Sequence, residues 1–287
     1  MNPDSIKNFT IKKWLNYRIL KLRLLKDPEL PTPKKGGKTS ISDGSTYLLI
    51  CKETLNNKNV YKNFRRYEAY FDILEHVSKD LGFEYLKIIL KADPLLKSFN
   101  QSKIQNSIGN PIKYYYRKTG FTSPTLLRYL KVHDELNTLF GPLDNKIITE
   151  IGVGYGGQAG VIMLNNQISH YNLFDLEEVN NLASKFLRDI GIYSNFTTFD
   201  GRNPSLVKSN LVVSNYAFSE LNRNTQNLYL ENVILNSETG YLTWNDLGYR
   251  NFGALSINEI VERIPNANII DEQPQSDPSN KIIVWGV

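Results

Sequence analysis

The segment IITEIGVGYGGQAG, residues 147–160, decides which fold is expected for this chain. Two isoleucines begin a short apolar strand, Glu150 lies near its end, and a glycine-rich turn follows. Gly152, Gly154 and Gly156 can take positive φ angles, so the backbone of this turn can approach a ligand closely. A strand, a carboxylate and a glycine turn in this order indicate a nucleotide-cofactor site, although a purely structural strand-to-helix turn also favours glycine.

The composition fits a globular chain with a large core. The 287 residues are 41% hydrophobic, which is enough to fill one large domain or a domain with a substantial appendage. A lone cysteine, Cys51, excludes an internal disulfide framework and a cysteine-based zinc site, and it suits a cytoplasmic protein. The three histidines are far apart in the sequence, so no metal site is predicted; a divalent ion would need distant carboxylates.

The positive charge is concentrated at the N-terminus. The formal net charge is +5, but residues 1–38 hold ten Lys or Arg and three Asp or Glu, so the remaining chain carries a net −2. A domain that grips a nucleic-acid backbone is expected to carry its own basic surface. The distribution therefore argues against a nucleic-acid substrate.

Residues 6–26 have apolar side chains at near-helical spacing with basic residues between them, which predicts a basic amphipathic helix. The segment is too charged to cross a bilayer and lacks the features of a signal peptide. The helix either packs on its own domain or on a second subunit of a homodimer, or it lies on an anionic membrane surface. Residues 31–37, PTPKKGG, are interpreted as a linker, so residues 1–38 form an arm and linker.

The rest of the chain divides into two patterns. Residues 39–140 are mostly helical and predict a helical cap or substrate region, whereas residues 141–287 alternate short apolar strands with helices. This alternation is typical of a doubly wound α/β sheet. Strands are expected at 147–151, 171–175, 196–199, 210–214, 240–244, 268–271 and 281–287, with helices at 157–167, 178–190, 225–236 and 256–263.

The last two strands separate two cofactor hypotheses. A loop with two prolines and no helix joins them, so they are expected to be antiparallel neighbours. A seven-stranded mixed sheet that ends in such a hairpin is the arrangement of class I S-adenosylmethionine-dependent methyltransferases, which are Rossmann-like. A dinucleotide dehydrogenase would continue into further βαβ units, so NAD is the second choice.

Acidic residues at strand ends extend the cofactor hypothesis. Asp175 follows Gly152 by 23 residues and ends the second strand, where a carboxylate can accept both ribose hydroxyls. The glycine turn resembles the E/D-x-G-x-G-x-G loop of methyltransferases, in which the acid, here Glu150, serves the cationic methionyl end of the cofactor directly or through water. Asp200 and Gly201 end the third strand, where methyltransferases present groups to adenine; a surface turn is the alternative. The predicted cofactor-binding residues are Glu150, Gly152, Gly154, Gly156, Asp175, Asp200, Gly201 and Ser214.

Several motifs together resemble a known family. They are EIGVGYGGQ, LFDLEEV, SNYAFSELNRNTQNLY and GYLTWN, with IGNP and TSPTLLRYL upstream. From about Asn57 to the C-terminus the chain is similar to a family of proposed sugar O-methyltransferases within class I. The resemblance implies methyl transfer from S-adenosyl-L-methionine to a hydroxyl of a nucleotide sugar or glycan, in glycan biosynthesis.

Transfer of a methyl group to a sugar hydroxyl requires in-line alignment and a base, or a metal that lowers the hydroxyl pKa. Catalytic groups in such sheets lie beyond the carboxyl ends of the strands. This selects Glu220 as the first choice for base, Asp246 as the second choice or a metal ligand, and Asn245 as a group that orients sugar hydroxyls. Each of them has a structural turn role as its alternative.

Four residues are predicted to bind the substrate. Asn215 and Tyr216 follow the fourth strand, and Tyr116 and Arg128 belong to the predicted cap, where aromatic rings suit a pyranose and arginine suits a cofactor carboxylate or a nucleotide-sugar phosphate. His170 precedes a strand and is expected at the opposite edge of the sheet. His76 and His133 fall in predicted helices and are expected to be packed or exposed there, unless a cap that folds over the site brings one of them in.

Two other functions share this fold. One is an amino-sugar N-methyltransferase with the same cofactor, and the other is a non-catalytic glycan-binding protein. Nucleic-acid N-methylation is disfavoured because residues 214–217, SNYA, lack the proline pair of the N/D-PP-Y motif.

Overall fold

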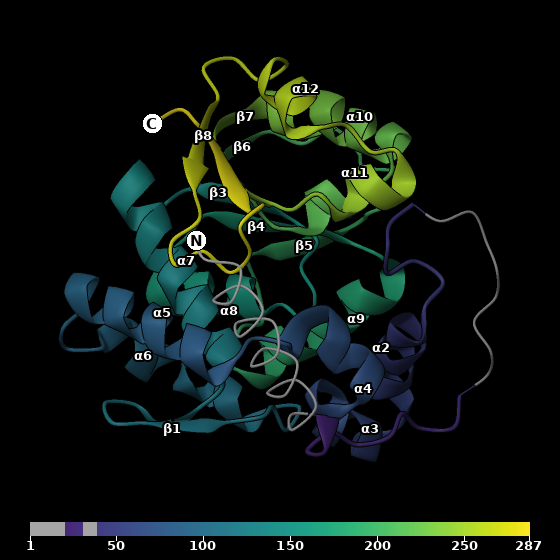
Figure 1. Ribbon diagram of the computed structural model, residues 1–287, viewed down its shortest axis with the longest axis vertical. Helices are drawn as coiled ribbons and strands as arrows, with labels where there is room; N and C mark the ends of the chain where they lie inside the picture. Colours follow the sequence, from purple (N-terminus) through teal and green to yellow (C-terminus); the bar gives the residue numbers. More distant parts are fainter. Residues whose placement is uncertain (1–20, 31–38) are drawn as a thin grey trace, which may run out of the picture.

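A seven-stranded mixed sheet forms the centre of the protein (Figure 1). The computed structural model describes residues 21–30 and 39–287. The strands are β3 (Ile147–Ile151), β4 (His170–Asp175), β5 (Phe196–Asp200), β6 (Ser209–Asn215), β7 (Ser237–Trp244), β8 (Asn268–Asp271) and β9 (Lys281–Trp285). Their order across the sheet is β5-β4-β3-β6-β7-β9-β8. All neighbours are parallel except the two pairs that involve β9, which are antiparallel. The antiparallel β8–β9 pair is the one that the helix-free connection predicts.

Helices cover both faces of the sheet because its central strands are apolar on both sides. Along β6, Leu211 and Val213 belong to one core cluster and Val212 belongs to the other. The first face is covered by α7 (Pro124–Phe140), α8 (Gly157–Asn165) and α9 (Glu177–Asp189). The second face is covered by α10 (Arg223–Asn232) and α12 (Ile257–Val261), with α11 (Leu247–Phe252) beside them (Figure 1).

The N-terminal helices form an additional layer on the first face. They are α2 (Thr46–Asn56), α3 (Lys58–Asn63), α4 (Glu68–Tyr70), α5 (Lys79–Ala92) and α6 (Lys97–Ser102). Tyr47 and Ile50 of α2 share one core cluster with Leu182 and Phe186 of α9. The hydrophobic core is therefore continuous from this layer to the sheet, and the division into 39–140 and 141–287 stays a prediction.

Short turns of other helical types complete the chain. They are the 3-10 turns η1 (Phe64–Arg66), η3 (Lys103–Ser107), η4 (Ala217–Glu220) and η5 (Ile234–Asn236), and the π-helical turn η2 (Phe71–Glu75). The π-helical turn lies inside the region expected to be mostly helical, and π-helical turns are frequent at functional sites. His76 follows this turn immediately.

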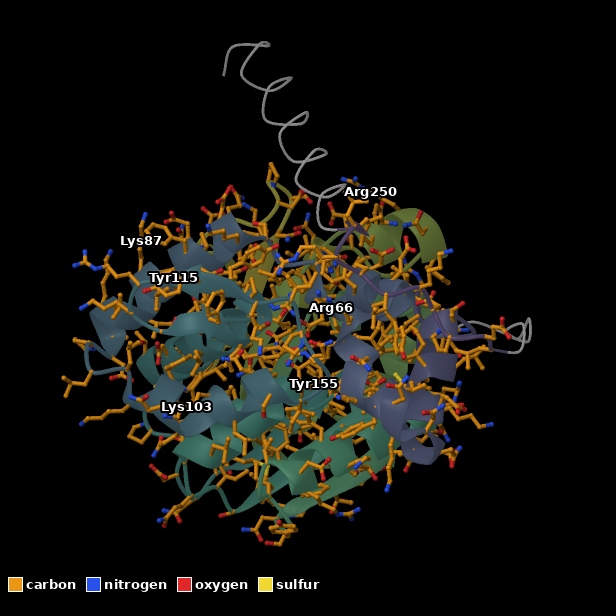
Figure 2. The ribbon with its side chains drawn as sticks, turned by 90° about the horizontal axis from the view of Figure 1, so that it is seen from below. Arg66, Lys87, Lys103, Tyr115, Tyr155 and Arg250 are labelled. Carbon is orange, nitrogen blue, oxygen red and sulfur yellow. The ribbon has the colours of Figure 1, made fainter. Side chains whose placement is uncertain are left out.

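A buried ion pair fixes this turn against its surroundings. Arg65 Nε donates to Glu75 Oε1 at 2.7 Å and Arg65 Nη2 donates to Glu75 Oε2 at 3.1 Å. Thr125 Oγ1 at the start of α7 donates to the same Glu75 oxygen at 3.1 Å. The guanidinium lies over the ring of Tyr155, which Figure 2 shows in the interior of the molecule. The pair ties η1, η2, α7 and the glycine turn together.

Two predicted features differ from the structure or lie outside it. Residues 114–116 and 120–122 form a two-stranded antiparallel hairpin, β1 (Tyr114–Tyr116) and β2 (Gly120–Thr122), inside the region expected to be helical. Three consecutive tyrosines before a tight turn favour extended backbone, because aromatic side chains pack well in strands. The arm helix lies mostly, and the linker wholly, outside the described residues. Within 21–30 and 39–287, no helix combines the length and apolar character required to span a bilayer.

Candidate active site

A cavity of about 1130 Å³ lies at the carboxyl ends of β3, β4, β6 and β7. The strand order reverses direction between β3 and β6, and ligands of open α/β sheets bind at such a switch point. The N-terminal layer and the loop between β8 and β9 contribute the other walls. The cavity is larger than most sites for a single small ligand, so a cofactor and an acceptor can occupy it together.

The glycine turn forms part of the cavity wall. Gly152, Gly154 and Gly156 have φ angles of +77°, +53° and +84°, so all three use the conformational freedom that the sequence predicts. Gly152 and Gly154 line the cavity, whereas Gly156 is the residue that precedes α8. A Cβ atom on Gly152 would lie 1.9 Å from the Cβ of Ala217, so β3 and η4 approach each other too closely for any side chain here.

Asp175 holds the glycine turn and faces the cavity. Its Oδ2 accepts a hydrogen bond from Gly154 N at 3.1 Å and its Oδ1 accepts one from Leu176 N at 2.8 Å. Burial raises the pKa of Asp175 to about 6, against the backbone hydrogen bonds that lower it. A carboxylate has about four acceptor positions, so two remain for ligand hydroxyls.

Two other predicted cofactor residues lie behind the cavity wall. Glu150 is buried and accepts a hydrogen bond from the Tyr171 hydroxyl at 2.8 Å, and burial raises its pKa to about 8. Ser214 Oγ donates to Ile151 O at 2.8 Å and accepts from Phe218 N at 3.0 Å. Neither residue lines the cavity. Ser214 joins β3 to η4, which is a structural role, and Glu150 can reach a ligand only indirectly.

Gly201 lines the cavity, whereas Asp200 does not. Asp200 Oδ1 accepts a hydrogen bond from Arg202 N at 3.0 Å, which is the turn geometry given above as the alternative for this residue. A Cβ atom on Gly201 would lie 2.8 Å from the carbonyl carbon of Asp175, so β4 and the end of β5 are in close contact.

Residues 39–42, here termed the strap, line the cavity beside these strand ends. Thr39 O accepts a hydrogen bond from Asn222 N at 2.9 Å. Asp43 directly after the strap forms an ion pair with Arg202 at 2.9 Å. Burial opposes ionisation of Asp43, but hydrogen bonds from Arg202 and Thr39 outweigh it and lower its pKa. No sequence signal marks the strap, because its position depends on contacts with residues about 160 to 180 positions later.

The three predicted catalytic residues are brought together. Asn245 Nδ2 donates to Glu220 Oε1 at 2.8 Å, and both residues line the cavity with Asp246. Burial raises the pKa of Glu220, and the hydrogen bond from Asn245 opposes this change only in part. Asp246 accepts from Trp244 Nε1 at 3.3 Å and lies 3.6 Å from Arg250.

Three of the four predicted substrate residues line the cavity, namely Arg128, Asn215 and Tyr216. Tyr116 does not. Its hydroxyl donates to Lys79 O at 3.1 Å, and its ring packs where a Cβ on Gly82 would lie, so Tyr116 joins the β1–β2 hairpin to α5.

Glu272 is buried behind Tyr216 and supports the cavity wall without lining it. The Tyr216 hydroxyl donates to Glu272 Oε1, and Ser276 Oγ donates to Glu272 Oε2 at 2.6 Å. Tyr216 has a φ angle of +68°, which is strained for a tyrosine and is found mainly at functional positions. Glu272 lies on the β8–β9 loop, 56 positions from Tyr216, so only the fold brings them together.

His76 also lines the cavity, so the cap does bring one histidine in. Desolvation by the surrounding protein and the charge of Arg128 lower its pKa to about 4, against an opposing effect of Asp72. His76 is therefore a neutral imidazole at physiological pH. His133 is buried next to Asn137 and Asn166, and His170 begins β4 at the opposite edge of the sheet, as expected.

Acidic and histidine side chains are common ligands of metal ions in proteins. Within residues 21–30 and 39–287, no group of three or more His, Cys, Asp or Glu side chains is arranged to hold a metal ion.

The strand order identifies the fold. A parallel block with one reversal of direction, closed at one edge by an antiparallel last strand inserted between β7 and β8, is the arrangement expected for class I methyltransferases. The protein has the class I methyltransferase fold. No family model matches the sequence, and no curated protein matches it.

Solved structures with a related architecture carry methyltransferase names. A proposed RNA methyltransferase from Pyrococcus horikoshii is 12% identical with a TM-score of 0.42, and the match covers 66% of this chain and 96% of that one. An S-adenosylmethionine-dependent methyltransferase from Clostridium acetobutylicum is 10% identical with a TM-score of 0.42, over 55% and 88%. A proposed O-methyltransferase from Nostoc punctiforme is 11% identical with a TM-score of 0.41, over 71% of each chain.

Proposed function

We propose that this protein transfers the methyl group of S-adenosyl-L-methionine to a sugar hydroxyl. The observation that carries the proposal is one cavity at the switch point of the sheet. Its wall contains the open backbone of the glycine turn and the Asp175 carboxylate, and next to them the Glu220–Asn245 pair. The first two fit a nucleoside cofactor, and the pair fits proton removal from an acceptor.

The cofactor end of the cavity is assigned to β3, β4 and the strap. Asp175 accepts hydrogen bonds from the ribose hydroxyls, while Gly201 and the strap enclose the adenine. The backbone of Gly152 and Gly154 borders the part of the cavity assigned to the methionyl group. Glu150 lies behind this wall and acts on the methionyl amine through water.

The acceptor end is assigned to the residues that follow β6 and β7. The acceptor oxygen attacks the methyl carbon in line with the carbon–sulfur bond, which breaks as the new carbon–oxygen bond forms. Glu220 takes the hydroxyl proton, and S-adenosylhomocysteine leaves. The raised pKa of Glu220 makes it a stronger base than an exposed glutamate, and Asn245 holds its carboxylate in place. Asp246 and His76 are alternative bases in the cavity wall.

The sugar acceptor is supported by the sequence resemblance and by the lining of this end. Tyr85 and Tyr216 provide aromatic faces for a pyranose, and Asn215, Asn245 and Asn280 provide amides for its hydroxyls. A nucleotide sugar and a glycan both present these groups, and nucleic acid is not the proposed acceptor. The protein would then act in glycan biosynthesis.

The cofactor assignment is tested by calorimetric titration with S-adenosylhomocysteine. We expect micromolar affinity in the natural sequence and a loss of at least about tenfold in Asp175→Ala and Gly154→Val. Asp189→Ala, which removes an exposed carboxylate at the end of α9, and Gly141→Val, at a positive-φ glycine with open space, are the matched controls. Equal affinity in Asp175→Ala and Asp189→Ala would reject the site assignment.

The reaction is tested with S-adenosylmethionine that carries a deuterated methyl group and a panel of sugars, sugar nucleotides and amino sugars. Mass spectrometry locates the label on oxygen or on nitrogen, which separates O-methylation from amino-sugar N-methylation. Glu220→Gln is expected to lower kcat by about 10²- to 10⁴-fold with cofactor affinity unchanged. Cofactor binding without turnover on any acceptor would instead indicate a glycan-binding protein.

A further inference from the structure

Arg128 is a buried cation in the cavity that lacks an acidic partner. It lies in the first turns of α7 and is 9% exposed. Its Nη2 donates to Leu74 O at 3.4 Å, which is a long hydrogen bond, and its Nε has no hydrogen-bond partner among the described residues. Within the described ranges no carboxylate lies at ion-pair distance from it. A guanidinium has five N–H donors, so most of its hydrogen-bonding capacity is left for a ligand.

Arg65 shows how the same fold satisfies a structural arginine. Both of its forked donors bind Glu75, and Nη1 donates to Gln105 O at 3.0 Å. Burial of an unpaired charge is costly, and buried charges are normally paired. The difference between these two buried arginines therefore points to a group that Arg128 binds and that is not part of the chain.

The surroundings of Arg128 suit an anionic ligand bound inside the cavity. Three tyrosines lie around it, Tyr129, Tyr85 and Tyr216, and its guanidinium is 5.4 Å from the ring centre of Tyr129. Burial raises the pKa of all three hydroxyls, so none of them supplies a negative charge at physiological pH.

The cavity also has carboxylates, but those nearest the outside, including Asp80 and Asp277, are exposed. Water screens exposed charges more than buried ones, so these outer carboxylates oppose an anion at Arg128 only weakly. The partly buried carboxylates of the wall, Asp175 and Glu220, form no ion pair with Arg128 in the described part of the chain.

Two anionic groups can reach the cavity under the proposed function, and position favours the acceptor. The α-carboxylate of the cofactor belongs at the glycine turn. Arg128 is near Tyr85 and Tyr216, and Tyr216 continues directly from β6 on the acceptor side. Arginine binds phosphate and carboxylate oxygens with two parallel hydrogen bonds, which also fixes the orientation of the ligand.

We propose that Arg128 binds a phosphate or carboxylate group of the acceptor, so that the methylated molecule is an acidic sugar such as a sugar phosphate, a sugar nucleotide or a uronic acid. The inference rests on the proposed function for the identity of the acceptor. The anion at Arg128 anchors one end of the sugar. The hydroxyl to be methylated is then placed next to Glu220.

The test uses full-length protein saturated with S-adenosylhomocysteine and titrated with glucose 1-phosphate, glucuronate, pyrophosphate and, as the neutral control, glucose. We expect the anionic probes to bind the natural sequence and to lose about 10- to 100-fold in affinity in Arg128→Gln. Arg128→Lys keeps the positive charge but lacks the forked guanidinium, so its affinity for the anionic probes should lie between those of the natural sequence and Arg128→Gln. Arg223→Gln removes an exposed, Glu259-paired cation of α10 that does not line the cavity and is expected to change affinity less than about twofold.

A second ligand pair distinguishes the acceptor from the cofactor carboxylate. S-adenosylhomocysteine carries that carboxylate and 5′-methylthioadenosine lacks it. If Arg128→Gln weakens only S-adenosylhomocysteine, Arg128 serves the cofactor and the proposal is overturned. The proposal is also overturned if no anionic probe binds the natural sequence, or if Arg128→Gln and Arg128→Lys bind the anions as the natural sequence does. Failure of the natural sequence to bind S-adenosylhomocysteine, with anion binding retained, would instead reject the proposed function.

Discussion

Replacement of Gly152 by alanine tests whether the glycine turn is sterically required. Gly152 has a φ angle of +77°, and its N–H donates to Phe174 O at 2.8 Å, which fixes the backbone in this position. An added Cβ would lie 1.9 Å from the Cβ of Ala217, and neither atom can move without its backbone. The left-handed conformation costs alanine about 1–2 kcal/mol. Overpacking adds roughly 1–3 kcal/mol, so Gly152→Ala should lower the free energy of unfolding by about 2–5 kcal/mol.

A control variant, Gly253→Ala, separates the conformational cost of alanine at positive φ from the cost of overpacking. Gly253 has a φ angle of +60°, and a Cβ atom added there would have no other atom within 4 Å, so Gly253→Ala should show only the conformational cost of about 1–2 kcal/mol. Ala217→Gly removes the clashing methyl group. The double variant Gly152→Ala/Ala217→Gly should therefore recover about 1–3 kcal/mol relative to the sum of the single variants.

Equilibrium unfolding in urea, followed by tryptophan fluorescence, measures all four variants. Calorimetric titration with S-adenosylhomocysteine then reports whether the turn still accepts the cofactor. Equal stability of Gly152→Ala and Gly253→Ala would refute the steric argument. Absence of coupling between positions 152 and 217 would also refute it, because the close approach of β3 and η4 would then not be the cause.

The other predictions concern ionisable groups. Asp175 has a pKa near 6 and binds ribose as a carboxylate, so S-adenosylhomocysteine affinity should fall as the pH falls through about 6; Asp175→Asn should remove this dependence. The same raised pKa means that the contribution of Asp175 to unliganded stability is present below about pH 3.8 and is lost as the pH rises through about 6. Thermal unfolding of the unliganded protein should show this loss, and Asp175→Asn should remove it. Glu75→Gln leaves Arg65 unpaired in the core and should cost about 3–5 kcal/mol in urea unfolding, and an unchanged midpoint would contradict this. Asp43→Asn breaks the ion pair with Arg202 beside the strap and should cost roughly 1 kcal/mol while weakening S-adenosylhomocysteine binding; equal affinity would exclude the strap from the cofactor site.

Local patterns were sufficient to predict most of the sheet. β3 and β8 have the predicted bounds, and the other strands differ by a few residues at their ends. Alternating apolar strands and helices specify the layers, and a helix-free connection specifies an antiparallel pair. The β1–β2 hairpin was missed because its strands are three residues long, too short for a periodic signal.

The positions of the site residues were only partly predictable. Asp175 ends β4, Asn245 directly follows β7 and Glu220 follows β6 by five residues, so the rule that strand ends meet at one edge of the sheet places all three at the cavity. Glu150 and Ser214 lie near the ends of β3 and β6 but behind the cavity wall. Which side of a strand faces a cavity depends on the packing on each face, and the rule for strand ends does not supply this information.

The sequence by itself determined the class of fold and the carboxyl edge of the sheet as the place for chemistry, because strand periodicity, glycine conformation and connection length act over a few residues. Only the tertiary structure decided which distant groups complete the site. The strap and His76 line the cavity, and Glu272 holds Tyr216 in its wall, through contacts between residues far apart in the chain. The packing of α7 against its neighbours places Arg128 in the cavity with Nε unbonded among the described residues. Such contacts depend on the summed packing of the whole core, which no local pattern encodes.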